Sequence, residues 1–113
     1  MTLREKIVKL ADEVAHEVYS ETLKFSSEHR FAIGDQLRRA ALSVPTNLIE
    51  GFARKSLKER HQFISIAYAS LKETKYLLYF ASKQKLLGNS FYQRISPKTE
   101  ELSKLLYIFL HKR

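Results

Sequence analysis

Residues 36–54 read Gln-Leu-Arg-Arg-Ala-Ala-Leu-Ser-Val-Pro-Thr-Asn-Leu-Ile-Glu-Gly-Phe-Ala-Arg and are the most informative stretch of the chain. At helical spacing, the apolar residues of this stretch form one stripe, which indicates a helix with a buried face. A polar row lies directly beside that stripe and consists of Ser43, Asn47, Glu50 and Arg54. An unpaired buried polar group costs on the order of 2–7 kcal/mol. The row therefore needs partners on another helix or on a second subunit, and the segment is a candidate polar interface.

Helical periodicity continues along almost the whole chain, which has only three Gly and two Pro. We expect helices over residues 2–24, 28–54 and 57–87, and a fourth that starts after a cap at Asn89 or Ser90. Joined by short loops, such helices form an all-α, antiparallel, up-down-up-down four-helix bundle. The length favours a single domain over residues 1–113.

Residues that favour helix ends mark the expected boundaries. Ser26 or Ser27 can accept hydrogen bonds from the first free amides of the second helix. Ser56 and Glu59 have the spacing of a capping box at the start of the third helix. Gly88 is placed to end the third helix in the left-handed conformation.

Pro45 and Pro97 lie inside expected helices. Because an interior proline costs about 3 kcal/mol or more, we expect the second helix to be kinked near Pro45, within residues 41–45, or to be split there in two. Pro97 either interrupts the fourth helix or starts its main part. Gly51 has no Cβ and so allows a neighbouring backbone or side chain to approach closely.

Several kinds of chemistry are not supported by the composition. The absence of Cys excludes disulfides and Cys-based metal sites. The four His lie on different expected helices, and no phosphate-cradling Gly-rich loop or nucleophile motif is present, so we expect no metal, no cofactor and no enzymatic activity. Glu50 and Glu73 could share a proton as an acid–base pair, although pairing with nearby polar side chains is favoured. Apolar runs fall short of the ~20 residues of a membrane span and the first residues do not resemble a secretory signal, so we expect a cytoplasmic protein with no membrane partner.

The formal net charge is +8, and it rises along the chain from −1 over residues 1–30 to +6 over residues 61–113. A basic protein of this kind is typical of polyanion binding, but a solubilising lysine-rich surface fits equally well. Asp35 could neutralise an arginine one turn later in the same helix. The tyrosines Tyr76 and Tyr79 share a broad face with lysines and could stack on bases. The candidate nucleic-acid-binding residues are Arg38, Arg39, Arg54, Lys55, Lys58, Arg60, Lys72 and Lys75.

Residues 36–54, together with Ser56, Phe63, Ile66-Ala67 and Ser70-Leu71-Lys72-Glu73, resemble the four-helix-bundle family of bacterial 23S rRNA intervening-sequence proteins. The family pattern is roughly Q-hydrophobic-R-R-A-x-x-S-hydrophobic-P-x-N-I-x-E-G, followed by an Arg and an I-A-x-G-S-L-x-E box. Two positions depart from it, since Leu48 replaces the usual Ile and Ala69 the usual Gly.

The resemblance implies a bundle that assembles as a ring, as a homopentamer, and that binds RNA or DNA. A more distant structural relative is the accessory protein of diversity-generating retroelements, a basic pentameric bundle that binds nucleic acid and a reverse transcriptase. The conserved polar positions of the family map onto Asn47, Glu50, Ser70 and Glu73 of this chain. With Ser43 they form a structural polar motif, which we expect to pair the second helix with the third or to line a subunit contact.

Two functional hypotheses follow. The first is a non-enzymatic, ring-forming, basic protein that binds nucleic acid, such as rRNA, through phosphate contacts. The alternative is a protein-binding scaffold that docks a partner enzyme and binds no nucleic acid.

Overall fold

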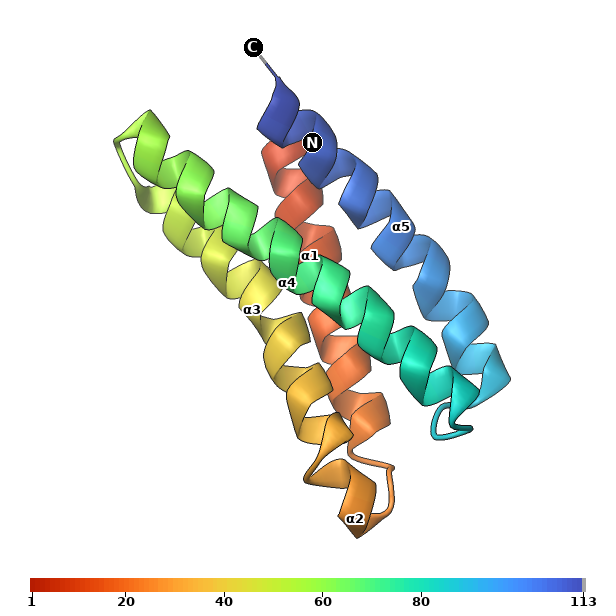
Figure 1. Cartoon of the computed structure of the whole chain (residues 1–113). Helices are drawn as coiled ribbons and strands as arrows, with labels where there is room; N and C mark the ends of the chain where they lie inside the picture. The colour runs from red at the N-terminus through yellow and green to blue at the C-terminus, as the bar shows by residue number, and fades with distance from the viewer. Residues whose placement is uncertain (113) are drawn as a thin grey trace.

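The computed structural model describes residues 1–112 and has an all-helical architecture. Its elements are α1 (Leu3–Thr22), α2 (Ser27–Arg30), α3 (Ile33–Ala53), α4 (Leu57–Lys83) and α5 (Asn89–His111). The four long helices run up-down-up-down, and the short α2 forms one extra turn between α1 and α3 (Figure 1). The predicted antiparallel four-helix bundle is therefore confirmed.

Each long helix packs against two others, and the packing order is α1, α3, α4, α5 and back to α1. The most extensive contact is between α3 and α4. The start of α1, the α3–α4 turn and the end of α5 lie at one end of the molecule, which we call the terminal end (Figure 1). The short α2 and the α4–α5 turn lie at the opposite end, and the molecule is 43 Å long.

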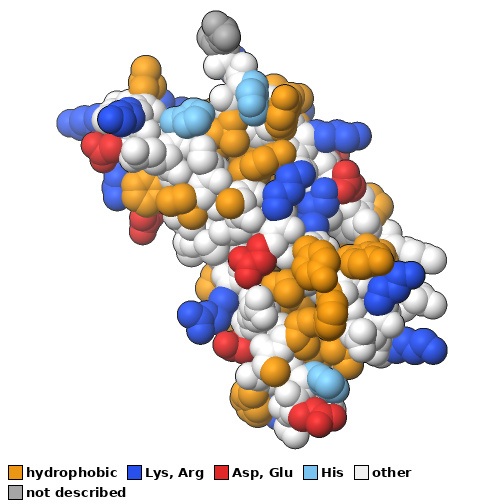
Figure 2. Space-filling model, viewed as in Figure 1, with side chains coloured by type: hydrophobic (Ala, Val, Ile, Leu, Met, Phe, Trp, Pro, Cys, Tyr) orange, Lys and Arg blue, Asp and Glu red, His pale blue; other side chains and the backbone are white. Residues whose placement is uncertain are grey.

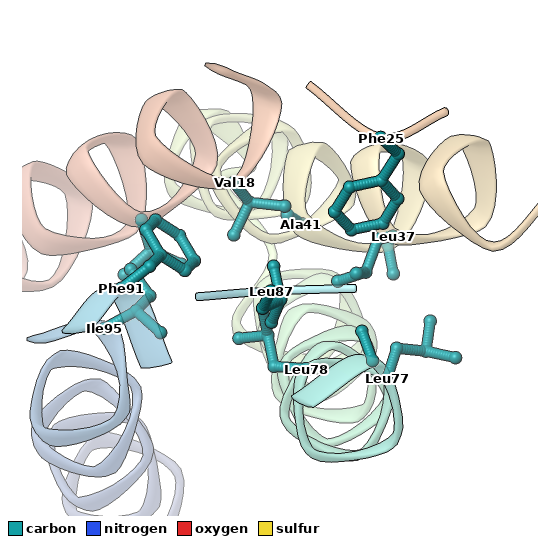
Figure 3. Close-up of a cluster of buried hydrophobic side chains, with 12 residues drawn as sticks. Val18, Phe25, Leu37, Ala41, Leu77, Leu78, Leu87, Phe91 and Ile95 are labelled. Atoms are coloured by element: carbon teal, nitrogen blue, oxygen red, sulfur yellow. The ribbon is translucent and has the colours of Figure 1, made fainter. Parts of the chain in front are cut away.

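The core consists of two clusters of buried side chains, one in each half of the bundle. The cluster nearer the terminal end contains Ile7, Val44, Leu48, Ile64, Leu71, Leu102 and Leu106. In the other cluster, side chains from all four long helices converge around Leu87 of the α4–α5 turn (Figure 3). Burying one such aliphatic side chain contributes about 1.5–3 kcal/mol, so this packing outweighs the local penalties described below.

The predicted helix over residues 28–54 is wrong at its start, because the chain leaves helical geometry at Phe31 and Ala32. Ala32 has φ −114° and ψ −102°. The carbonyl oxygen of Arg30, which the break leaves without a helical partner, accepts a hydrogen bond of 2.8 Å from Nη2 of Arg38. Ser26 occupies the N-cap position of α2, but its side chain makes no capping hydrogen bond.

Both prolines lie inside continuous helices. The helix α3 continues through Pro45, so the predicted possibility of a split there is wrong. The helix α5 continues through Pro97, which neither interrupts it nor starts its main part. Pro45 and its neighbours Val44 and Leu48 are buried, and the apolar area that they bury stabilises the helix against the loss of one backbone hydrogen bond.

The helix α4 ends at Lys83, four residues earlier than predicted. Lys85, with φ 62°, takes the left-handed position of a Schellman motif, in which the Leu86 amide donates to the Ala81 carbonyl at 2.9 Å. Gly88 has φ −69° and is the N-cap of α5, so its predicted role as the terminator is wrong. Asn89 and Ser90 likewise lie inside α5 and do not cap it. Burial of Leu87 in the core selects this tighter turn.

Of the two hydrogen bonds in the predicted capping box at Ser56, only one forms. The Ser56 hydroxyl accepts a hydrogen bond of 3.2 Å from the Glu59 amide. The Glu59 carboxylate turns to Arg54 instead, at 3.6 Å from its Nε. A complete capping box forms at the start of α1 between Thr2 and Glu5, and the sequence reading missed it.

Gly51 permits a close approach of α3 and α4, as predicted. A Cβ added at this position would lie 2.9 Å from Cβ of Phe63 and 3.0 Å from Cδ1 of Ile64. Real Cβ atoms almost never approach a neighbour to 2.9 Å. The Phe63 atom is the first of its side chain, so it moves only with the backbone of α4. The end of α3 is therefore held against the start of α4 at a distance that only glycine allows.

We expect Gly51→Ala to destabilise the fold by about 1–2 kcal/mol, because the cost of overpacking exceeds the ~1 kcal/mol that alanine gains over glycine inside a helix. Urea unfolding followed by circular dichroism measures the effect. Gly88→Ala is the matched control, since nothing lies within 4 Å of its added Cβ. An equal effect of the two substitutions on the unfolding midpoint would contradict the close-approach role of Gly51.

We expect Lys85→Gly to stabilise the fold by about 1 kcal/mol, because glycine adopts positive φ without the steric cost that a Cβ imposes. The urea midpoint should rise for this variant. Lys85→Ala is the control: it removes the same charge and keeps the Cβ, so its stability should stay close to that of the parent chain. A gain of similar size in both variants would show that charge is the cause.

Candidate nucleic-acid interface

Positive charge gathers at the terminal end of the bundle. Residues 1–10, 47–62 and 104–112 meet there and carry nine Lys or Arg side chains against three Glu, a net charge of +6. The other described residues carry ten basic and nine acidic side chains, a net charge of +1. Lys and Arg side chains are visible at the α3–α4 turn in Figure 2. This asymmetry along the axis of the bundle differs from the one along the sequence, because residues 1–10, 47–62 and 104–112 each contribute a net charge of +2.

Four of the eight predicted nucleic-acid-binding residues lie at this end. Lys55 belongs to the α3–α4 turn, Arg54 flanks it on the α3 side, and Lys58 and Arg60 lie on the first turn of α4. The sequence reading missed the basic residues that other segments bring to the same end. An up-down-up-down order brings both chain ends beside the second interhelical turn, and this signal could have identified Arg4, Lys6, Lys9, Lys104 and Lys112.

The two arginines beside the turn make internal contacts. Nη2 of Arg60 donates a hydrogen bond of 2.9 Å to the carbonyl oxygen of Arg54, beyond the end of α3. The guanidinium of Arg54 lies over the ring of Phe63, with 4.5 Å between Cζ and the ring centroid. Both side chains are only partly exposed. They hold the turn in place.

The lysines of the turn are the groups that face solvent. Lys55 and Lys58 are exposed, and neither makes an ion pair or a side-chain hydrogen bond within residues 1–112. A lysine ammonium in water is a mobile point charge with three donors, which suits a phosphate oxygen. At this turn the arginines therefore stabilise the structure, and the lysines are available to bind a ligand.

Two contacts of aromatic rings join the three segments of the terminal end. The rings of Phe52, on α3, and Phe109, on α5, make an edge-to-face contact with centroids 5.4 Å apart. The guanidinium of Arg4, on α1, lies 4.4 Å from the Phe52 centroid. These contacts hold the start of α1 and the end of α5 against the end of α3, at the terminal end.

Arg38 and Arg39 lie far from this surface. They precede Arg54 by about four turns of α3, which places them roughly 24 Å away along the helix axis. Arg38 donates to the Arg30 carbonyl, and its Nη1 is buried. Arg39 is exposed and lies 3.7 Å from the carboxylate of Asp35, as the pairing alternative predicted.

Lys72 and Lys75 connect α4 to α5. Nζ of Lys72 donates a hydrogen bond of 2.9 Å to Oγ of Ser103 and lies 5.0 Å from the ring centroid of Tyr68. Lys75 forms an ion pair with Glu100. The hydrogen bond and the charge of Lys75 lower the pKa of the Glu100 carboxyl below its ordinary value. Both lysines thus already have a partner on α5, although Lys72 is exposed.

Some residues of the polar motif join α3 to α4. The hydroxyls of Ser43 and Ser70 lie 2.9 Å apart across the two helices. Nδ2 of Asn47 donates to both the carbonyl and the hydroxyl of Ser43, at 2.8 and 2.9 Å. Nε2 of Gln36 lies 3.5 Å from Glu73 in a second contact between the helices. The Ser43–Ser70 and Gln36–Glu73 contacts join the two helices, whereas the hydrogen bonds of Asn47 stay within α3.

Glu50 does not take part in that pairing. It is exposed and lies near the terminal end, about four turns of α3 from Gln36, the partner of Glu73. That spacing amounts to roughly 21 Å along the axis. Glu50 and Glu73 therefore cannot share a proton, and the acid–base pair considered from the sequence is wrong.

Within residues 1–112, no three His, Asp or Glu side chains are grouped so that they could hold a metal ion. No helix in that part of the chain combines the length and the apolar character of a membrane span.

Residues 4–108 match the family described as 23S rRNA-intervening sequence protein. The chain belongs to this family. Its resemblance to 23S rRNA-intervening sequence proteins is thus confirmed over almost its whole length. The crystal structure of a protein of unknown function from the S23 ribosomal protein family of Bacteroides thetaiotaomicron has a TM-score of 0.89 to it, at 20% identity, over 96% of this chain and 98% of that one. That likeness shows the fold alone. Neither description names a reaction, and no curated protein matches the chain.

We expect Lys75→Gln to raise the pKa of Glu100 toward its ordinary value of 4.5, because Lys75 is the largest cause of the lowering. In the folded chain the lowered pKa means that the Glu100–Lys75 pair stabilises the fold above pH 4.5 and that its contribution is lost as the pH falls through the folded-state pKa. A carboxyl carbon NMR titration measures the shift.

Lys98→Gln is the control for that titration, because Lys98 pairs with Glu17 at 2.5 Å and not with Glu100. The Glu100 titration should be the same in this variant as in the parent chain. The assignment fails if Lys75→Gln leaves the Glu100 midpoint where it was.

Proposed function

We propose that this protein is a non-enzymatic nucleic-acid-binding protein whose terminal end contacts phosphates. The observation that carries the proposal is the net charge of +6 at that end, against +1 in the rest of the described chain. An excess of basic side chains at one end of the bundle attracts a polyanion and releases its counterions on binding. The name of the family makes RNA derived from 23S rRNA the first ligand to test.

The phosphate contacts belong to the lysines of the terminal end in this proposal. Lys55 and Lys58 are exposed on a turn that Arg54 and Arg60 hold in place. Because the backbone of the turn is already held in place, less conformational entropy is lost on binding. Lysine–phosphate contacts position a nucleic acid and carry no sequence information, so the expected binding is insensitive to base sequence.

We also propose that the chain assembles as a homopentameric ring, as its family resemblance implies. An apolar groove between α1 and α3 supports self-association. Its apolar lining includes Val8, Pro45, Phe52 and Ile49, and Ile49 is 59% exposed; the charged residues Arg4, Glu5, Lys9 and Asp12 line it as well. Apolar side chains exposed in a groove mark interaction surfaces. A ring would present several basic ends to one nucleic acid and so increase the avidity.

The second candidate function is a protein-binding scaffold. The same groove between α1 and α3 favours it, because a partner protein could bury Ile49 as a second copy would. On this alternative, the charge of the terminal end serves solubility and the chain binds no nucleic acid.

We expect the double variant Lys55→Ala/Lys58→Ala to bind RNA more weakly for every sequence tested. Each lost phosphate contact reduces the slope of log affinity against log salt by about 0.7–0.9. Fluorescence anisotropy with labelled RNA at several salt concentrations measures both effects.

The charge-matched control is Lys24→Ala/Lys98→Ala, which removes two lysines that already pair with glutamates away from the terminal end. It should retain the affinity and the salt slope of the parent chain. Equal weakening by both double variants would mean that only the total charge matters. No salt-sensitive binding by the parent chain would favour the scaffold alternative.

We expect light scattering to give about five times the 13.2 kDa mass of one chain, and we expect Ile49→Glu to reduce that mass by placing a charge in the groove. Ile66→Glu is the control, since Ile66 is similarly exposed but lies on α4, outside the groove. A monomeric parent chain would overturn the ring, and dissociation by Ile66→Glu alone would place the interface elsewhere.

A further inference from the structure

A second hollow lies at the end of the molecule opposite the basic surface. It has a volume of about 660 Å³ and opens between the last turn of α4 and the first turn of α5. Its polar and aromatic lining consists of Tyr79, Ser82, Lys83, Lys85, Asn89 and Tyr92. Pockets that bind small molecules commonly have volumes of 300–1,000 Å³, so the hollow is large enough for one nucleotide.

Aromatic rings form part of its wall. Tyr79 is 47% exposed, and Tyr92 is half-buried and packs against the core. Tyr76 lies next to Tyr79, with ring centroids 6.3 Å apart. Side chains of the hydrophobic class, in which Figure 2 includes tyrosine, gather over the C-terminal half of α4. An exposed tyrosine held against a rigid neighbour presents a flat face on which a base can stack.

The charge of the hollow is positive. Lys83 and Lys85 line it, and within residues 1–112 no acidic side chain does so. Nζ of Lys83 lies 5.8 Å from the Tyr79 centroid, so an ammonium and a ring face are close together. The helix α5 begins here without an acidic residue in its first turn, which adds the positive end of its dipole.

The backbone conformation of Lys85 is unusual for a lysine. It occupies the left-handed position of the α4 terminus, with φ 62°, where glycine is the residue of lowest strain. A lysine there keeps its charge beside the hollow at a conformational cost. The fold alone would favour glycine.

We infer that this hollow binds a nucleoside monophosphate unit, with the base against Tyr79 and Tyr92 and the phosphate between Lys83 and Lys85. Ser82 and Asn89 supply a hydroxyl and an amide that can hydrogen-bond the sugar or the base edge. A free mononucleotide and the phosphorylated end of an RNA strand offer this same chemistry. The site is separate from the terminal end, and it does not depend on the function proposed for that end.

The test is a ¹H–¹⁵N NMR titration of the full chain at low ionic strength with AMP, adenosine and inorganic phosphate as separate probes. AMP should produce saturable shifts confined to the hollow, and each of the other probes should bind about tenfold more weakly because it lacks half of the contacts. Lys85→Gly should weaken AMP binding about tenfold although it stabilises the fold, and Tyr79→Leu should weaken it to a similar degree.

The control variant is Lys55→Ala/Lys58→Ala, which should bind AMP as the parent chain does. This control separates a failure of the hollow from a failure of the basic end. The inference is overturned if AMP gives no saturable shifts at the hollow. It is equally overturned if inorganic phosphate binds as tightly as AMP and Tyr79→Leu changes nothing, because the site would then recognise an anion without a base.

Competition by short single-stranded RNA identifies the source of the unit. Displacement of AMP by 5′-phosphorylated RNA, but not by the same RNA with a 5′-hydroxyl, supports the inference and assigns the site to RNA ends. Saturable AMP binding that neither RNA displaces supports it with a free mononucleotide as the ligand.

Discussion

The close approach of α3 to α4 is the constraint on which the rest of the structure depends. At one end of this contact, Gly51 leaves room for Phe63 and Ile64 where no Cβ would fit. In its middle, the short side chains of Ser43 and Ser70 meet at 2.9 Å. The two helices form the most extensive contact in the molecule. The helices α1 and α5 complete the core from the other side.

This contact also determines which charged side chains of the α3–α4 turn are packed against the bundle and which are exposed. Because the turn is short and the helices beside it are close, the carbonyl of Arg54 needs a donor, and Arg60 supplies it. The Cβ of Phe63 packs against Gly51, and the ring of the same side chain lies under the guanidinium of Arg54. The two arginines are thus part of the packing, and the exposed charge is left to Lys55 and Lys58. The proposed function depends on this division.

The sequence predicted the elements and the bundle because helical periodicity and short loops are local signals. It left open a split of α3 at Pro45 and an interruption of α5 at Pro97, since the penalty of a proline is local and the burial that offsets it is tertiary. The end of α4 was placed at Gly88 by residue type, whereas the burial of Leu87 puts Lys85 in the left-handed position.

Residue type alone was also not sufficient to predict which basic side chains lie on the same surface. Arg38 and Arg60 donate to backbone carbonyls, and no sequence pattern marks which carbonyls a helix end leaves free. Lys75 faces Glu100 across two helices, a partnership that becomes visible only with their packing. By contrast, the meeting of both chain ends with the α3–α4 turn follows from the up-down-up-down order itself, so Arg4 and Lys104 could have joined the predicted surface.

The central claim is that nucleic acid meets the terminal end of the bundle. Amide hydrogen exchange of the chain, with and without a blunt RNA duplex that carries 5′-hydroxyl ends, tests it most directly. Added protection should appear over residues 54–60, together with the start of α1 and the end of α5. Protection centred on the middle of α4, around Lys72 and Lys75, with no change over residues 54–60, would contradict it.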